Sequence, residues 1–294
     1  MRLLSPLEVC VNGAAEQRGP TAREARAKGS QARLLVQKVG SLSVVRGCFA
    51  TSPLRILTPR NHGHAAWAYT STLGGGLVDG DRVRLHIEVD AGAAAVLSTQ
   101  GETRVYRSPR GCHNELSAEV NDGAFLAVLP DPTVCFADAR YNQRTEIAVA
   151  PKGALVLADI LAAGRTARGE RWAFKRYAAE LTLRMGERVV LAESVLLDPR
   201  HGPIVERFGR FEVLATLLLA GERLRTYCNA LREELQQLPP TARATLIESA
   251  NALGEDALLV RMASLSLEDA LRSIRRHLSF LPLLLGDDPW TRRN

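Results

Sequence analysis

Three copies of one short phrase decide the fold of this chain: IEVDAGA at residues 87–93, AEVNDGA at residues 118–124 and IAVAPKGA at residues 147–154. Their Gly-Ala pairs begin at Gly92, Gly123 and Gly153, a spacing of about 30 residues that is typical of repeated structural units. In each copy an alternating run leads to a polar turn and an apolar run follows, which predicts a strand, a tight turn and a second strand. A single hairpin cannot bury its own apolar face. The repeat therefore predicts β units that stack into a layered core, with matching positions above one another.

Strand-like sequence extends on both sides of the repeats, from Arg33 to about Ala220. The segment RVRLHIEV (82–89) alternates apolar and polar residues, as expected for a strand with one buried face. After Gly221 the apolar period changes to about 3.6 residues, which predicts helices at about 222–238 and 267–281, with Ser266 as the N-cap of the second. The predicted fold class is mainly β: a stacked, solenoid-like, layered β-sheet body with a few α-helices toward the C-terminus.

The start of the chain differs from the rest. Residues 12–32 are polar, rich in Ala and Gly, and lack an apolar period. We therefore expect residues 1–32 to be a flexible N-terminal segment and residues 33–294 to form a single β-rich domain. Five cysteines are scattered without a CxxC spacing, and the first residues lack the apolar core of a secretory signal, so a reducing, cytoplasmic location is expected.

Two apolar runs stand out, LATLLLAG (214–221) and LPLLLG (281–286). Both are far shorter than the ~20 residues that a membrane span needs, so we expect no membrane association. We expect instead that these runs form surfaces that a partner covers.

The chain carries 38 Lys and Arg against 32 Asp and Glu, a formal net charge of +6, with basic residues spread along its length. Nucleic-acid binding favours a basic cluster with interleaved aromatic residues, whereas aromatic residues make up only 5% of this chain. A solvated basic surface or an acidic protein partner fits the pattern better. The segments RVYRS (104–108) and GRTARGER (164–171) carry guanidinium groups suited to carboxylates, although Glu170 beside Arg168 and Arg171 also fits an internal salt bridge.

The densest glycine cluster is LGGGLVDGD at residues 73–81. It lacks the Lys and the Ser or Thr of a phosphate-binding loop, does not match the GxGxxG dinucleotide fingerprint, and leads into a strand instead of a helix. One interpretation is a tight crossover between strands. The other is a contact with an ion or a partner, in which Asp79 and Asp81 supply carboxylate oxygens.

His62 and His64 flank Gly63 in a loop after Pro59. Two imidazoles at this spacing can share a transition metal ion. No Cys or carboxylate lies close in sequence to complete a site, so a transient or exposed metal site fits better than a structural one.

A third candidate site follows from the repeat itself. After each repeat glycine, the second strand ends in polar or turn-forming residues: Ser98, Thr99 and Gln100; Leu129, Pro130 and Asp131; and Asp159. Stacking in register would gather these groups at one end of the core, with Asp138, Arg165 and Glu170 on the following loops. Because buried polar groups are costly unless they are hydrogen-bonded or hydrated, such a column predicts a water-filled passage. The alternative is that each residue is an ordinary turn residue at a strand end.

The chain contains no GxSxG, HExxH or CxxC motif, and no Cys has an obvious His partner. The segments GGGLVDGDRVRLHIEVDAGAAAVLSTQGETRVYRS (74–108) and LPDPTVCFADARYNQRTEIAVAPKGALVLADILAAGRTARGERW (129–172) together resemble the urease accessory protein family called UreD or UreH. The resemblance runs from about Ser52 to Leu197 and continues more weakly to the end. Its most specific elements are GG-hydrophobic-x-GD, STQxxTRVYRS, LPxPxxxFxDA and GRxxxGE.

The resemblance implies a non-enzymatic, β-rich scaffold that binds apo-urease together with an accessory protein similar to UreF and a GTPase similar to UreG. It implies a hetero-oligomer that delivers nickel to urease, with GTP bound by the GTPase and no cofactor held permanently by this chain. It also implies an internal water-filled route for nickel, which agrees with the predicted polar column. The chain departs from the family pattern at Asp159, where Glu is frequent, and at Asn61, His62 and His64, where Cys and His are common.

Nickel in transit would exchange among weak oxygen and imidazole ligands, because a tight site would trap it. We expect this relay to draw on the following residues: Asp79, Asp81, Asp131, Asp138, Asp159, Glu170, His62 and His64. Two rival hypotheses remain. The first is a metal-dependent enzyme that uses the loop histidines with the two aspartates of the glycine cluster, and the second is a basic nucleic-acid-binding β module.

Overall fold

The computed structural model describes residues 8–9, 29–237 and 241–291 of the chain. Most of the segment expected to be flexible, residues 1–32, lies outside the described residues, although strand β2 already begins at Ser30. None of the helices in the described ranges has the length and apolar character that a membrane span requires.

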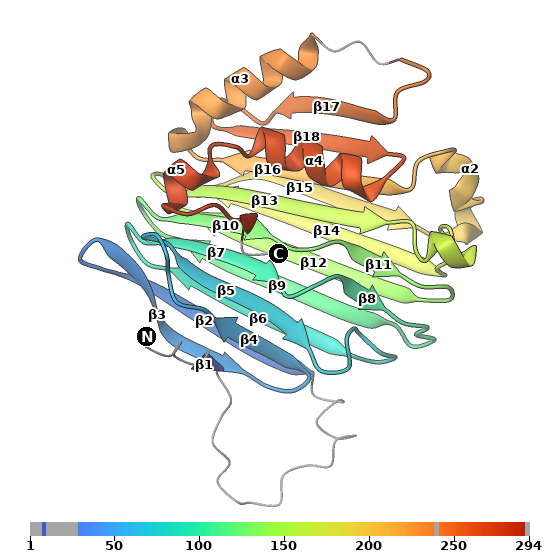
Figure 1. The fold of residues 1–294 in the computed structure, drawn as a ribbon, viewed down its shortest axis with the longest axis horizontal. Helices are drawn as coiled ribbons and strands as arrows, with labels where there is room; N and C mark the ends of the chain where they lie inside the picture. The colour runs from blue at the N-terminus through green and yellow to red at the C-terminus, as the bar shows by residue number, and fades with distance from the viewer. Residues whose placement is uncertain (1–7, 10–28, 238–240, 292–294) are drawn as a thin grey trace, which may run out of the picture.

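The strands form two large sheets, as Figure 1 shows. The first, sheet A, has eleven strands. Its main path runs β1 (Glu8–Val9), β4 (Leu54–Thr58), β5 (Ala66–Thr72), β7 (Ala94–Thr99), β10 (Phe125–Leu129), β13 (Ala154–Ala162), β16 (Val213–Ala220), β18 (Ala257–Ser264) and β17 (Leu246–Ala252), with β8 (Thr103–Val105) and β11 (Thr133–Cys135) beside it. The second, sheet B, has seven strands in the order β15 (Arg188–Leu197), β14 (Arg176–Met185), β12 (Arg140–Val149), β9 (Cys112–Val120), β6 (Arg82–Val89), β2 (Ser30–Val39) and β3 (Leu42–Ala50).

The repeated phrase builds the centre of both sheets. In each copy the first strand belongs to sheet B and the second to sheet A, so the pairs β6 and β7, β9 and β10, and β12 and β13 each cross from one sheet to the other. The predicted hairpins are therefore wrong, because the two strands of a copy lie in different sheets and pair in parallel with the matching strands of the next copy. The predicted stacking of matching positions is confirmed: Ala94, Phe125 and Ala154 lie side by side in sheet A.

The turns between the paired strands stack through their backbones. Gly92 N donates to Asp122 O at 2.9 Å, and Gly123 N donates to Lys152 O at 3.1 Å. Both glycines adopt positive φ, +69° and +67°, which costs Gly less than any other residue. We call this end of the stack the turn end. The opposite end, which carries residues 73–81, 100–111, 130–139, 163–175 and 198–212, is the loop end.

Apolar side chains fill two layers. The larger core lies between the sheets and includes Ile87, Leu126 and Ile147. The other core lies between sheet A and the C-terminal helices and includes Leu217 of β16 and Leu231 of α3. The apolar run at 214–221 is thus the interior of a central strand, and the prediction that a partner covers it is wrong. In the run at 281–286, Leu283 alone among the leucines is exposed, at 78%.

The helices lie late in the chain, as predicted, and three of them pack against the outer face of sheet A (Figure 1). They are α3 (Arg225–Gln236), α4 (Leu267–His277) and α5 (Leu281–Leu285), whereas α2 (Ile204–Phe208) lies at the loop end. Short 3-10 turns occupy η1 (Thr166–Arg168), η2 (Pro199–His201) and η3 (Glu222–Leu224). Ser266 caps α4 as predicted, since its side chain accepts a hydrogen bond from Asp269 N at 3.1 Å.

Candidate functional site

A cavity of about 450 Å³ lies between the two sheets. Its walls are strand residues, drawn from most of the neighbouring strands of sheets A and B, so it crosses the stack instead of following one strand. The cavity has room for water and small ions and holds several polar side chains. If the predicted polar column exists, its residues should line this cavity.

One row of mostly polar residues runs across sheet A and faces the cavity. Its members are Thr70, Thr99, Pro130, Asp159, Thr216, Arg261 and Ser249; six lie in adjacent strands, and Pro130 directly follows β10. In the sheet, Thr70 pairs with Thr99, Asp159 with Thr216, and Thr216 with Arg261. Thr99, Pro130 and Asp159 occupy equivalent positions in the three repeats. Each lies two residues after a set of paired residues, Leu97, Val128 and Leu157. Of the predicted polar column, Thr99, Pro130 and Asp159 lie in this row, which extends beyond the repeats. The water-filled passage stays a prediction.

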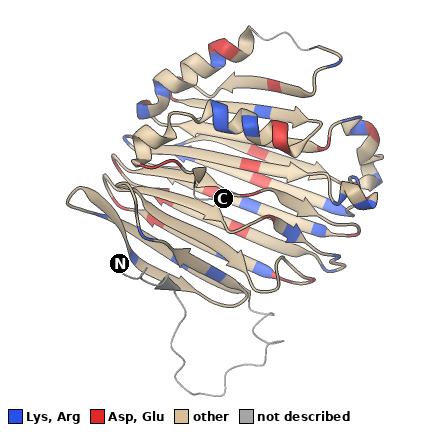
Figure 2. Cartoon of the chain, viewed as in Figure 1, with Lys and Arg blue, Asp and Glu red and all other residues tan. Residues whose placement is uncertain are grey.

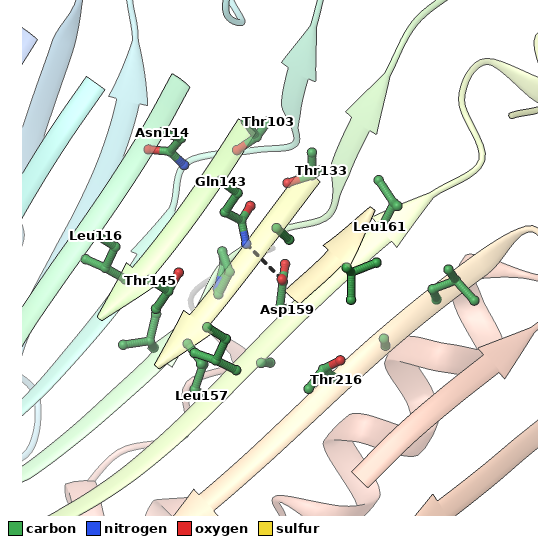
Figure 3. Close-up of a pocket in the computed structure, with 18 of the residues that line it drawn as sticks. Thr103, Asn114, Leu116, Thr133, Gln143, Thr145, Leu157, Asp159, Leu161 and Thr216 are labelled. Atoms are coloured by element: carbon green, nitrogen blue, oxygen red, sulfur yellow. Dashed lines mark hydrogen bonds between the residues drawn. The ribbon is translucent and has the colours of Figure 1, made fainter. Parts of the chain in front are cut away.

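The facing wall of sheet B carries a hydrogen-bonded chain that reaches Asp159. Asn114 Nδ2 donates to the Tyr141 hydroxyl at 3.1 Å, and that hydroxyl donates to Gln143 Oε1 at 3.2 Å. Gln143 Nε2 then donates to Asp159 Oδ2 at 2.8 Å, which joins the two sheets across the cavity (Figure 3). Each polar group in the chain has a partner, as buried polar groups require.

Burial raises the pKa of Asp159 to about 6, and the hydrogen bond from Gln143 opposes this rise. The side chain is surrounded by protein but keeps some accessible surface, because it faces the cavity. Near neutral pH its carboxylate is therefore ionised and faces a cavity with both polar and apolar walls. A cation that enters the cavity would compensate this charge better than the surrounding apolar walls do.

A second carboxylate lines the cavity near strands β15 and β18. Glu193 Oε1 accepts a hydrogen bond from Arg261 Nη2 at 2.7 Å, and this ion pair also joins sheet B to sheet A. Glu193 contributes to the raised pKa of Asp159, because two like charges in one cavity disfavour each other.

The remaining strand-end residues are held by hydrogen bonds between layers. Ser98 Oγ donates to Leu129 O at 2.7 Å, and Thr99 Oγ1 donates to Asp131 Oδ2 at 3.1 Å. Asp131 N in turn donates to Thr99 Oγ1 at 2.7 Å. Asp131 thus lies next to the polar row, one residue beyond Pro130.

The two aspartates of the glycine cluster lie at the loop end, outside the cavity. Asp79 accepts from Arg110 Nε at 2.8 Å and from Arg110 N at 2.7 Å, and the guanidinium lowers the pKa of the Asp79 carboxyl. Asp81 is buried, and its Oδ2 accepts from Val78 N at 2.8 Å within the turn. Both carboxylates help to hold the crossover that leads from β5 to β6.

The other loop-end candidates are also ion-paired. Asp138 lies 3.3 Å from Lys175 Nζ, and Glu170 pairs with Arg165. The hydrogen bond from Arg165 lowers the pKa of Glu170. The internal salt bridge considered for Glu170 is present, although its partner is Arg165 and not Arg168 or Arg171.

The loop that carries the two histidines packs against α5 at the turn end. His62 is exposed, whereas His64 Nε2 lies 2.9 Å from Leu284 O. The structure brings neither histidine to Asp79 and Asp81. Across the residues that the structure describes, no group of three or more His, Cys, Asp and Glu side chains is arranged to hold a metal ion.

Four further cavity residues were not among the predicted site residues: Asn114, Gln143, Glu193 and Arg261. The sequence does contain a sign of these residues, because apolar and polar residues alternate along their strands and a polar residue on the apolar face interrupts the pattern. In RYNQRTEIAV (140–149), for example, Gln143 occupies the same face as the buried Tyr141 and Ile147, where an apolar residue is expected. A polar residue on the buried face of a strand is therefore the pattern that identifies the cavity wall.

Comparison with known proteins gives consistent matches. A family model described as UreD urease accessory protein matches residues 28–293. A urease accessory protein UreD of Sorangium cellulosum (strain So ce56) is 46% identical over 266 residues, which cover 90% of this chain and 85% of that protein. A protein of the same name from Anaeromyxobacter sp. (strain Fw109-5) is 40% identical, with 88% of each chain covered. The urease accessory protein D of Oryza sativa subsp. indica is 30% identical, with 90% of this chain and 97% of that protein covered.

Proposed function

Because this chain belongs to the UreD family of urease accessory proteins, we propose that it is a non-catalytic scaffold that delivers nickel to apo-urease. It acts in a cytoplasmic hetero-oligomer with an accessory protein similar to UreF and a GTPase similar to UreG. The GTPase binds the GTP, and this chain holds nickel only in transit. The alternative metal-dependent enzyme has no support from the placement of His62, His64, Asp79 and Asp81, which lie at different ends of the stack.

The observation that carries this proposal is the cavity between the sheets with Asp159 at the middle of its polar row. A carboxylate, an amide oxygen and hydroxyl groups are weak ligands for nickel, so an ion can enter and leave. Asp159 is the central residue of the route, with Asp131 beside the row. The other predicted relay residues, Asp79, Asp81, Asp138, Glu170, His62 and His64, would act only at the outer surfaces.

The first test is deletion of the gene, followed by measurement of urease protein, urease activity and nickel bound to urease. We expect urease protein to persist without nickel and without activity. Normal nickel-loaded urease in the deletion strain would contradict the proposed function.

The second test is the variant Asp159→Asn, which keeps the shape of the side chain and an oxygen that accepts from Gln143. We expect the nickel content of urease to fall while capture of urease and of the UreF-like protein stays unchanged. The matched control is Asp122→Asn at the turn end, where the side chain accepts only from Lys152 N among the described residues. Loss of complex formation in Asp159→Asn would show that this residue is structural.

A further inference from the structure

At the loop end, outside the cavity, side chains from three segments pack against one another in a row, and a fourth segment contributes Gly76 beneath it. Tyr106 packs over Gly76, where an added Cβ would lie only 2.8 Å from the tyrosine ring. The Tyr106 and Phe136 rings meet edge to face, with centroids 5.2 Å apart. The guanidinium of Arg165 lies over the Phe136 ring, 4.1 Å from its centroid. We call Tyr106, Phe136 and Arg165 the loop-end row.

The loop-end row is held in place before any partner binds. Two nitrogens of Arg165 donate to Glu170, and Glu170 also accepts from Ala137 N at 3.1 Å. Gly164, at φ +117°, allows this closure, since a Cβ there would lie 2.6 Å from Glu170 O. Arg165 nevertheless keeps 34% of its side-chain surface exposed. An arginine that is already held rigid loses little conformational entropy when a partner binds. Arginine and aromatic residues are also the types that contribute most binding energy at protein interfaces.

The charge around the loop-end row is not balanced. Arg107, next to Tyr106, and Arg168, in η1 between Arg165 and Glu170, are both exposed. Neither forms an ion pair within the described ranges of the chain, whereas Arg165 and Arg110 do. Figure 2 shows basic residues around α2 at this same end, with acidic residues among them. Two exposed arginines thus belong to the same loops as the row, Arg107 next to Tyr106 in sequence and Arg168 in η1, and each guanidinium can receive a carboxylate.

From this arrangement we infer that the loop-end row, with Arg107 and Arg168, is a docking surface for an acidic protein surface. Carboxylates of the partner engage the two exposed arginines, and apolar groups of the partner pack on the edges of Tyr106 and Phe136. The surface lies outside the residues that line the cavity, so docking and passage of the cargo are separable. The inference rests on the proposed function only in the choice of the partners used in the test.

Nucleic acid fits this surface less well than protein does. A base needs an open aromatic face to stack on, and Arg165 already covers a face of Phe136 while Tyr106 meets it edge to face. The carboxylates of Glu170, Asp79 and Asp138 lie among the arginines of the same end and would repel phosphates. Duplex DNA is therefore a competing probe in the test.

The test is direct binding of the full chain to each purified protein product of the urease gene cluster, and to duplex DNA, at about 0.05 M and about 0.3 M salt. The variant is Arg107→Glu with Arg168→Glu. The control is Arg184→Glu with Arg188→Glu, two exposed arginines near the turn between β14 and β15 that undergo the same change of charge. Neither change removes an ion pair in the described structure, but Arg168 helps to lower the pKa of the Glu170 carboxyl, so the melting temperature of each variant is measured to show that it is folded.

We expect the dissociation constant for one protein of the cluster to rise about tenfold or more in the loop-end variant and less than about twofold in the control. Raising the salt concentration weakens binding of the natural chain and has little effect on the variant. A second variant, Phe136→Leu, removes the ring beneath Arg165 without changing charge and weakens the same interaction. Unchanged binding in the charge variant, or a loss confined to duplex DNA, would overturn the inference. Because binding is measured directly, this result is independent of whether the deletion strain lacks nickel-loaded urease.

Discussion

The two ends of the β stack are built by different means. At the turn end the layers meet through backbone: a Cβ on Gly221 would lie 2.4 Å from Gly153 O, and one on Gly153 would lie 2.9 Å from Val120 O. At the loop end close backbone contacts occur at some positions, such as Gly164, whereas Gly101 and Gly169 have no atom within 4 Å of such a Cβ. Side chains such as Arg165 and Glu170 add contacts between the loop-end segments. The turn end is therefore held mainly through its backbone, whereas the loop end combines backbone contacts with open positions and exposed polar side chains. Four predictions, the first with a matched control substitution, test this division.

The largest effect is expected at the turn end, for Gly221→Ala. This glycine has φ +117°, and the new methyl group would collide with the backbone of Gly153 and Ala154, which cannot rotate away. We expect the free energy of unfolding to fall by about 3 kcal/mol or more, measured by chemical denaturation. The matched change at the loop end, Gly101→Ala, should alter it by less than about 0.5 kcal/mol. Equal losses in the two variants would show that the ends do not differ as described.

The next effect concerns the cavity between the two ends. Burial holds the folded pKa of Asp159 near 6, above its usual 3.8, so the folded state binds the proton more tightly than the unfolded state does. The natural chain therefore loses stability as the pH rises from about 4 to about 6, by about 2–3 kcal/mol. Asp159→Asn lacks this loss. We expect the free energy of unfolding of the variant to rise relative to that of the natural chain between about pH 4 and about pH 6, measured by chemical denaturation at several pH values. A difference between the two free energies that stays constant over this range would contradict the raised pKa.

A smaller effect of opposite sign is expected for Glu170→Gln at the loop end. Its pKa is lowered, chiefly by the hydrogen bond from Arg165, so its contribution is complete above the ordinary value of 4.5 and is lost as the pH falls through the lower folded value. We expect a cost of about 1 kcal/mol at pH 7 that disappears in acid. The same denaturation series measures it. A cost that persists at low pH would mean that Glu170 acts by shape and not by charge.

An effect of about the same size, but independent of pH, is expected for Gly169→Ala, also at the loop end. The position has φ +76° and open space around it, so only the backbone conformation opposes the methyl group. We expect a loss of about 1 kcal/mol, with binding to partners unchanged. A loss as large as that of Gly221→Ala would indicate that η1 is packed as tightly as the turn end.

The sequence predicts the stack better than it predicts the path of the chain through it. The repeat spacing places Gly92 above Gly123 because parallel strands keep equal offsets, and this holds for Asp159 as well. The same pattern cannot distinguish a hairpin from a turn that crosses between sheets, since both need a strand on each side of a tight bend. That choice depends on which strands of neighbouring copies pair.

The candidate site shows the same limit. Asp159 follows from its distance to Gly153, but Arg261 reaches the polar row only because β16 and β18 add to sheet A as antiparallel strands. Carboxylates such as Asp79 resemble metal ligands in the sequence, and the arginine that neutralises them lies about 30 residues away in the next layer. Long-range pairing therefore decides which acidic residues remain available.

The parallel order of the central strands has a consequence for synthesis of the protein. Strands β7, β10 and β13 are each added to sheet A about 30 residues after the one before, so the layers can assemble in the order in which the ribosome releases them. Sheet A is extended beyond β13 only when β16 arrives. A chain that stops before Val213 leaves the long edge of β13 without this partner strand, and we expect such fragments to pair with one another and aggregate.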